Sequence, residues 1–159
     1  MKNLVLILAL LLASCGFHLR GEAPMPFGQV AITPEKSGLG LALKRALQTG
    51  GRVEVVAAGP RVYRLEILKE LIDRVILSLD AAGQVREYQL QYKVAFRLKN
   101  PEGDVVIPMS ELKLSRIMSY DNTQILAKTS EADLLYRNMR DDAVNQIMRR
   151  LSAYHPNEN

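Results

Sequence analysis

The stretch that decides the fold runs from Arg86 to Leu98 and reads REYQLQYKVAFRL. Alternate positions from Tyr88 to Leu98 are apolar, and the positions between them are almost all charged or amide side chains. A repeat of two residues is that of a β-strand, in which successive side chains point to opposite faces. The stretch is therefore predicted to be a long strand with one face in the core and one in water.

A second long strand is predicted before it, over residues 63–79. The apolar residues there keep mostly to one parity, but Lys69 and Asp73 interrupt the pattern, which predicts a bulge or break near them. Residues 80–83, DAAG, supply the glycine that a tight connection to the next strand requires.

A third strand is predicted over residues 105–120, after the glycine-containing turn at residues 101–104. Pro108 lies inside it, and because proline has no N–H to donate, this strand is expected at an edge or to carry a bulge. Strands of this length reach roughly 45 to 50 Å. The middle of the chain is thus predicted to be a meander of three long strands.

Shorter elements are predicted before the meander. Val30 and Ile32 indicate a short strand that Pro34 closes, and Ser37 is placed to cap a helix over residues 39–47. Val53, Val55 and Val56 have the pattern of another short strand.

After the meander, Ser130 and Asp133 resemble a capping box and predict the start of an amphipathic helix that continues through Leu151. Together these elements predict an α+β fold, with a mixed, mainly antiparallel four-stranded sheet and two α-helices packed on one face.

The first fourteen residues have the pattern of a secretory signal, with a basic Lys2 and an apolar run too short to cross a bilayer. The tetrapeptide Leu-Ala-Ser-Cys at residues 12–15 resembles a bacterial lipobox, so Cys15, the only cysteine, is expected to be lipidated. Gly16, in place of an aspartate, favours the outer membrane as the destination. The predicted organisation is a signal peptide (1–14), a lipidated tether (15–27), one α+β domain (28–154) and a tail (155–159).

Charge and composition exclude several classes of function. The net charge of the whole chain is +4, and losing Lys2 with the signal lowers it to +3. Basic and acidic residues alternate along the chain and form no concentrated basic stripe, so nucleic-acid binding is not expected. Neither His18 nor His155 has ligand partners at metal spacing, and no serine lies in a G-x-S-x-G setting, so no metal, cofactor or enzymatic activity is predicted.

Several segments carry a resemblance to a known family. They are CGFHLRG at 15–21, Glu87-Tyr88, Tyr120-Asp121-Asn122, ILAK at 125–128, Glu131, Leu134-Leu135, Asp142, Ile147 and Arg150-Leu151. These segments resemble the lipopolysaccharide-assembly lipoproteins of the LptE family over nearly all of the mature chain.

The resemblance implies a non-enzymatic lipoprotein on the periplasmic side of the outer membrane. Such a protein would form a 1:1 heterodimer with an LptD-like β-barrel, plug its lumen and assist lipopolysaccharide assembly into the outer leaflet. Lipopolysaccharide would be bound by cations near the hairpin ends. The strongest candidate is Lys128, followed by Arg116, and Arg86 and Lys93 are weaker candidates. An ordinary solvated lysine is the alternative for Lys128.

Two alternative functions are considered from the sequence. One is a tethered periplasmic ligand-binding or adaptor lipoprotein that acts without a barrel. The other, a lipid-modifying hydrolase, would need an activated nucleophile that the sequence does not offer.

Overall fold

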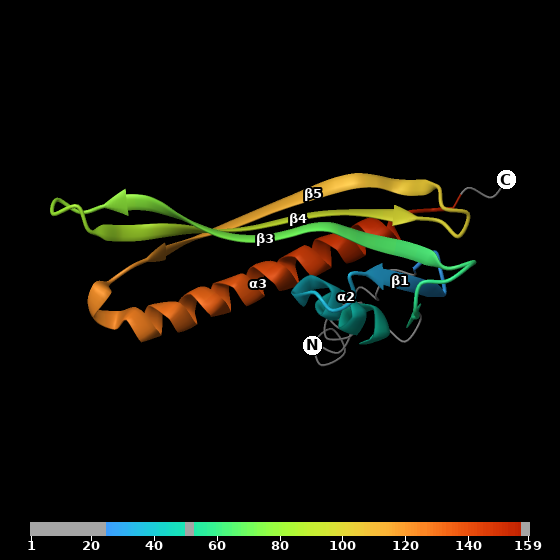
Figure 1. Cartoon of the computed structure of the whole chain (residues 1–159), viewed down its shortest axis with the longest axis horizontal. Helices are drawn as coiled ribbons and strands as arrows, with labels where there is room; N and C mark the ends of the chain where they lie inside the picture. Colours follow the sequence, from blue (N-terminus) through green and yellow to red (C-terminus); the bar gives the residue numbers. More distant parts are fainter. Residues whose placement is uncertain (1–24, 50–52, 157–159) are drawn as a thin grey trace, which may run out of the picture.

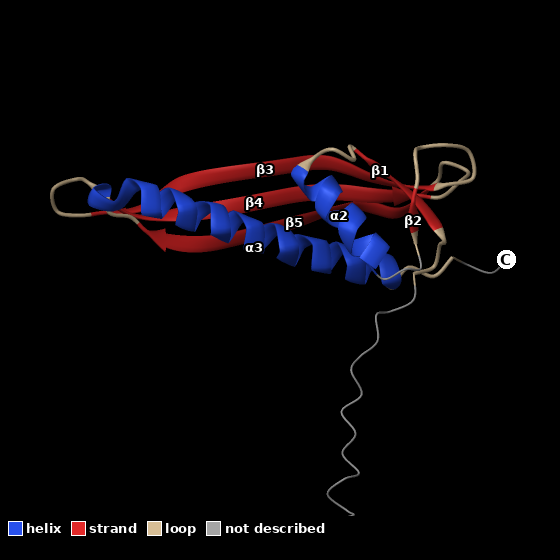
Figure 2. Ribbon diagram, turned by 90° about the horizontal axis from the view of Figure 1, so that it is seen from below, coloured by secondary structure: helices blue, strands red, loops and turns tan. Residues whose placement is uncertain are grey.

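The computed structural model describes residues 25–49 and 53–156. Its elements, in order, are β1 (Gln29–Thr33), α2 (Gly38–Thr49), β2 (Glu54–Val55), β3 (Tyr63–Leu79), β4 (Val85–Lys99), β5 (Val105–Ser119), the 3₁₀ turn η1 (Asn122–Gln124) and α3 (Ile125–Ser152). The strands form one sheet in the order β2-β1-β3-β4-β5, and both helices lie on the same face of it (Figure 1, Figure 2). The predicted α+β class and the one-sided helix layer are confirmed.

The predicted count of four strands was one too low, because β2 belongs to the sheet as a fifth strand. Its two residues pair parallel to β1, Glu54 with Gln29 and Val55 with Val30. The sequence predicted a short strand here from Val53, Val55 and Val56, but a two-residue strand is too short for its pattern to show that it joins the same sheet.

The three long strands form the predicted meander, with β3 and β5 both antiparallel to β4. Alternate residues of β4 are fully buried against the helices, namely Leu90, Tyr92, Phe96 and Leu98. The prediction for the central strand is therefore confirmed.

A bulge interrupts β3 at Leu68, close to the predicted interruption at Lys69. Ile67 pairs with Phe96 and Lys69 pairs with Ala95, so Leu68 is the extra residue. One extra residue reverses the alternation of side chains beyond it. Ile72, which pairs with the buried Tyr92, consequently lies on the helix-covered face.

The edge position of β5 agrees with its Pro108. Phe96 pairs with Ser110 and Leu98 with Ile107, so β5 also carries a bulge, which contains Pro108. Both expectations for this strand are confirmed.

Helix α2 begins as predicted, with the Oγ of Ser37 accepting a hydrogen bond of 2.9 Å from the N–H of Gly40. Its apolar side, formed by Leu39, Leu43 and Leu47, is buried. Gly40 lies so close to the preceding loop that a Cβ atom there would collide with the carbonyl oxygen of Pro34.

Helix α3 begins five residues before the predicted start, so the predicted capping box was wrong. The Oγ of Ser130 donates to the carbonyl of Leu126 inside the helix, 3.1 Å away. Asp121 instead caps the preceding turn η1 by accepting from the N–H of Thr123 at 2.8 Å. The first turn was missed because Ile125 and Leu126 are exposed and so add nothing to the buried stripe.

The two helices cover the sheet unequally. Helix α3 runs along most of the length of the meander, whereas α2 lies only beneath the half near β1 (Figure 1, Figure 2). The opposite end, where β3 turns into β4 and where β5 passes into α3, is called the hairpin end below. At the other end Phe27, assigned to the tether from the sequence, is buried and its ring stacks on that of Tyr63 at 5.0 Å between centroids.

Candidate functional site

The four cations predicted to bind lipopolysaccharide do not form one cluster. Lys128 and Arg86 lie at the passage from β5 to α3 at the hairpin end, where the backbone carbonyl of Arg86 accepts from the N–H of Tyr120 at 2.8 Å. Arg116 lies near the end of β5. Lys93 lies in the middle of β4, directly opposite Leu71 on β3 and Lys113 on β5.

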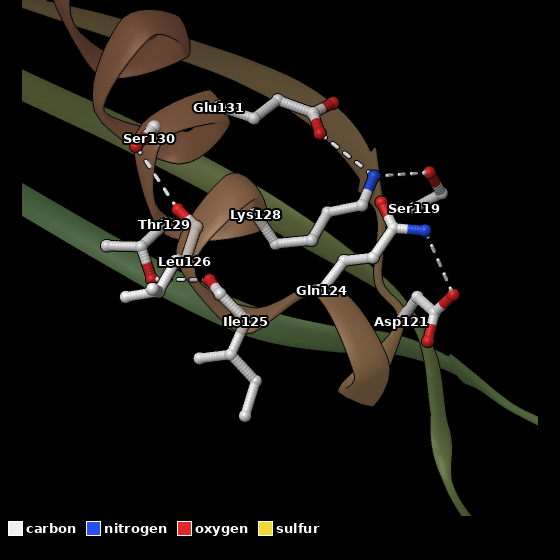
Figure 3. Close-up of polar contacts among 9 residues, drawn as sticks. All are labelled: Ser119, Asp121, Gln124, Ile125, Leu126, Lys128, Thr129, Ser130 and Glu131. Atoms are coloured by element: carbon white, nitrogen blue, oxygen red, sulfur yellow. Dashed lines mark hydrogen bonds and ion pairs between the residues drawn. The ribbon is translucent and has the colours of Figure 1, made fainter.

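Lys128 connects the start of α3 to the end of β5. Its Nζ donates to Oε2 of Glu131 at 2.9 Å and to Oγ of Ser119 at 3.2 Å (Figure 3). Only 15% of its side chain is exposed. An anionic ligand that binds here must therefore compete with Glu131 for this ammonium group.

The turn that presents Lys128 is held by Asp121. The Oδ1 atom of Asp121 accepts from both the backbone N–H and the hydroxyl of Thr123, at 2.8 and 2.7 Å. These hydrogen bonds, with a further contribution from the charge of Lys128, lower the pKa of Asp121. The carboxylate is thus charged at neutral pH and keeps the entry to α3 in one geometry.

Arg116 joins the last part of β5 to the middle of α3. Its Nη2 donates to Oδ2 of Asp142 at 2.7 Å, and a little under half of each side chain is exposed. Such an exposed pair contributes at most about 1 kcal/mol to stability, so Arg116 remains available to a stronger anion.

Arg86 occupies a bulge in β4. Ser78 pairs with Glu87 and Leu79 with Val85, which leaves Arg86 as the extra residue. It is exposed, and among the described residues its side chain has neither an ion pair nor a hydrogen bond.

The sequence analysis missed a run of exposed apolar side chains along β3. Seven large apolar residues there are between 39% and 55% exposed: Leu68, Leu71, Ile72, Val75, Ile76, Leu77 and Leu79. Because the bulge reverses the alternation, they lie on both faces of the strand. The predicted bulge near Lys69 was the available signal, but the reversal of the two faces beyond it was not predicted from it.

The same part of β3 is an open edge. Strand β1 pairs with β3 only as far as Glu66, and within residues 25–49 and 53–156 no other strand continues the pairing on that side. The hydroxyl of Tyr136 on α3 reaches the carbonyl of Asp73, 2.9 Å away. The opposite edge, β5, carries Pro108, which has no N–H to offer an added strand, whereas residues 68–79 of β3 contain no proline.

The predicted lipidation site Cys15, together with His18 and the proposed signal peptide, lies outside the described residues. Across the part of the chain that the structure covers, no helix combines the length and apolar character needed to cross a bilayer. Nor do its acidic, histidine and cysteine side chains gather there into a group suited to a metal ion.

Two solved structures have the same architecture over most of the chain. An uncharacterized lipoprotein B from Nitrosomonas europaea is 37% identical, with a TM-score of 0.75, covering 87% of this chain and 92% of its own. The rare lipoprotein B from Shewanella oneidensis is 27% identical, with a TM-score of 0.69, covering 79% and 94%. The long sheet with two helices on one face therefore defines a bacterial lipoprotein of the α+β class.

Sequence comparison makes the assignment more specific. The profile of the LptE family, described as Lipopolysaccharide-assembly, matches residues 27–151. The LPS-assembly lipoprotein LptE of Pectobacterium atrosepticum is 30% identical over 155 residues, which cover 94% of this chain and 83% of the relative. That of Yersinia enterocolitica is 30% identical over 161 residues, which cover 98% and 77%. The chain belongs to the LptE family, whose members are non-enzymatic lipoproteins of lipopolysaccharide assembly.

Proposed function

We propose that this lipoprotein sits as a plug in the lumen of an LptD-type outer-membrane β-barrel, in a 1:1 complex, and binds lipopolysaccharide during its assembly into the outer leaflet. The observation that carries the plug is the stretch of β3 from Leu68 to Leu79, which exposes seven large apolar side chains and whose outer edge pairs with no strand among the described residues. An exposed edge strand with apolar side chains on both faces is a hazard for a protein that stands alone in water. A partner that encloses this part of β3 removes the hazard.

The uncovered face of the sheet suits a water-filled lumen. Between the buried residues of β4 lie Glu87, Gln89, Gln91, Lys93 and Arg97. Arg97 and Lys99 both pair with Glu66 of β3, at 2.5 and 3.0 Å. Polar side chains that pair with one another keep this face hydrated without attracting a second sheet.

The plug is tested by purifying the tagged, full-length lipoprotein from outer membranes in a mild detergent. A heat-modifiable β-barrel protein in stoichiometric amount is the expected result. Val75→Glu together with Ile76→Glu places charge on both faces of the open strand and should release the barrel. Lys113→Glu on the opposite edge strand is the matched control and should not.

Purification without any barrel protein would contradict the plug. It would favour the tethered periplasmic ligand-binding or adaptor lipoprotein instead. Release of the barrel by Lys113→Glu as readily as by the β3 variant would show that β3 is not the contact.

Lipopolysaccharide binding is proposed at Lys128 and Arg116, with Arg86 as a third cation at the hairpin end. Lys128 and Arg86 lie at the hairpin end, and Arg116 lies near the end of β5, from which it reaches the middle of α3. Lipid A phosphates pair strongly with such groups. Lys93, on the other face of the sheet, is proposed only as a weak contributor. Charge reversal of Lys128 and Arg116 together should weaken lipopolysaccharide affinity by at least about tenfold. Arg149→Glu, at the far end of α3, is the control, and equal affinities in both variants would remove the assignment.

The anchor is proposed at Cys15, with residues 1–14 removed as a signal peptide and residues 15–27 leading to the domain. Several acyl chains on the new N-terminus would hold the protein at the outer membrane on its periplasmic side. Mass spectrometry of the purified protein should find an acylated N-terminal peptide that starts at Cys15. A Cys15→Ser variant should stay unprocessed and unacylated, and acylation that persists in that variant would contradict the site.

A further inference from the structure

A groove of about 460 Å³ lies between α2 and α3 on the helix layer. Its polar lining consists of Arg45, Arg137, Arg140, Asp141 and Asn145. Its apolar lining is made of small or branched side chains, Ala42, Ala46 and Val144. The groove uses none of the cations proposed above for lipopolysaccharide.

Positive charge dominates this groove. Three guanidinium groups face one carboxylate, a net charge of +2 for the lining residues. Arg137, Arg140 and Asp141 are three and four residues apart on α3 and so share one side of the helix, while Arg45 comes from α2. Of the three arginines, only Arg140 has an ion pair within the described residues, a long one of 3.8 Å to Glu70.

One nitrogen of Arg140, a lining residue of the groove, lacks a hydrogen-bond partner among the described residues. This nitrogen is Nε, and it is buried. The guanidinium rests against the first turn of α2, where a Cβ on Gly38 would lie 3.1 Å from the Cζ of Arg140. Oε1 of Glu70, the nearest carboxylate oxygen, already accepts from the hydroxyl of Tyr92 and from the N–H of Leu39. Glu70 therefore does not satisfy this donor, and the positive charge of Arg140 is only weakly balanced by it.

We propose that this groove binds a phosphate group. A phosphate monoester carries a charge of about −1.5 to −2 at neutral pH, which matches the lining, and planar guanidinium groups pair with its oxygens through two parallel hydrogen bonds. Glu70 behind Arg140 lowers the local charge to +1 and leaves the balance positive. The small side chains of Ala42, Ala46 and Val144 leave room for the carbon skeleton that carries the phosphate. The site goes beyond the proposed function, because it needs neither the barrel nor the hairpin end.

The test is calorimetric titration of the full-length, lipidated protein in an uncharged detergent at low ionic strength. Inorganic phosphate is the first probe, with chloride at equal ionic strength as the blank. Saturable phosphate binding is expected, and Arg45→Gln and Arg137→Gln should each weaken it by at least about tenfold. Both arginines are exposed, so these variants should keep the melting temperature of the parent. Arg149→Gln removes the same charge from α3 outside the groove and should leave the affinity unchanged.

Two further probes identify the source of the phosphate. Phosphatidylcholine vesicles with and without phosphatidic acid test a lipid-borne monoester. If the phosphatidic acid vesicles bind more tightly than free phosphate and lose that binding in Arg137→Gln, the source is a lipid. Binding of free phosphate alone indicates a soluble ligand, and either outcome supports the site.

Three results would overturn the proposal. The first is the absence of saturable phosphate binding, and the second is an equal loss of affinity in Arg149→Gln. The third is a glutamate-rich peptide that binds the groove more tightly than phosphate does. The last would make the groove a contact for an acidic protein segment.

Discussion

Tyr92, fully buried in the middle of β4, donates its hydroxyl hydrogen to Oε1 of Glu70 across a distance of 2.7 Å. The same oxygen accepts the N–H of Leu39 in the first turn of α2 at 3.1 Å. Burial raises the pKa of Tyr92, and the hydrogen bond and charge of Glu70 raise it further, so the hydroxyl remains a donor at any physiological pH. One carboxylate on β3, just beyond the bulge, thus joins the sheet to the start of α2.

Replacing Tyr92 with phenylalanine should remove that connection with little change in shape. A hydrogen bond to a charged group contributes about 1.5 to 3 kcal/mol, and the free energy of unfolding should fall by that amount. Denaturant unfolding of Tyr92→Phe measures it. Tyr136→Phe is the control, because its exposed hydroxyl bonds a neutral carbonyl, and it should lose less than about 1 kcal/mol. Equal losses in the two variants would mean that the charge of the partly buried Glu70 adds nothing to the hydrogen bond from Tyr92.

Gly40→Ala should destabilise the protein although alanine is the better helix former. The added methyl group would collide with the carbonyl of Pro34 and lie 2.7 Å from that of Glu35, both of them backbone atoms that cannot turn away. Overpacking of this kind costs about 1 to 3 kcal/mol, more than the roughly 1 kcal/mol gained in helix propensity. A fall in the melting temperature is expected. Gly28→Ala, with nothing within 4 Å of the new methyl group, should melt at or near the parental temperature.

Acid should remove the stabilisation that Glu66 provides. Burial alone would raise its pKa, but the hydrogen bonds and charges of Arg97 and Lys99 outweigh burial and lower it. A carboxyl whose pKa is lower in the folded protein stabilises it fully above the unfolded pKa, and the effect is lost as pH falls through the folded pKa. Glu66→Gln should therefore be less stable than the parent by about 1 kcal/mol near pH 7 and equally stable at about pH 2 to 3. Denaturant unfolding at both pH values checks this, and a constant difference would contradict the assigned pair.

Glu131→Gln should strengthen lipopolysaccharide binding if Lys128 holds a phosphate. The 2.9 Å ion pair between these residues competes with any ligand for the ammonium group. Removing an ion pair three residues apart on a helix changes stability by only about 0.2 to 0.5 kcal/mol, so affinity can be measured on a folded protein. Surface plasmon resonance on immobilised lipopolysaccharide measures the change. Glu35→Gln, which breaks a similar pair with Lys44 away from the hairpin end, is the control. If Glu131→Gln instead lowers the affinity for lipopolysaccharide, the role of Lys128 is to hold the start of α3 in place.

The strict alternation in β4 was sufficient to predict the meander and the burial of Leu90, Tyr92 and Phe96, because one face of that strand is covered along most of its length. The same rule failed on β3 beyond Leu68, where a single extra residue reverses the faces and where the helices cover little of the strand. The start of α3 was missed for a related reason. Ile125 and Leu126 are helical but exposed, so no buried stripe reveals them.

The candidate cations were only partly predictable from the sequence. The position of Lys128 before the last helix indicated a location near the hairpin end, but its contacts with Ser119 and Glu131 depend on how β5 meets α3. The groove between α2 and α3 was not predictable, since Arg45 and Arg137 are far apart in the sequence and only the packing of the two helices makes them neighbours.

The strand order also constrains the sequence of folding events when the N-terminal part of the chain is made first. Strand β1 lies between β2 and β3, and its longer pairing, from Val30–Tyr63 to Thr33–Glu66, needs residues that follow about thirty positions later. The two hairpins of the meander, in contrast, close over short turns and can form as soon as each strand is out. Strand β1 must therefore wait, with only the two-residue pairing to β2 available, until the first part of β3 has been made. A chaperone that binds the folding chain would therefore find β1 without its main partner until residues 63–66 are available.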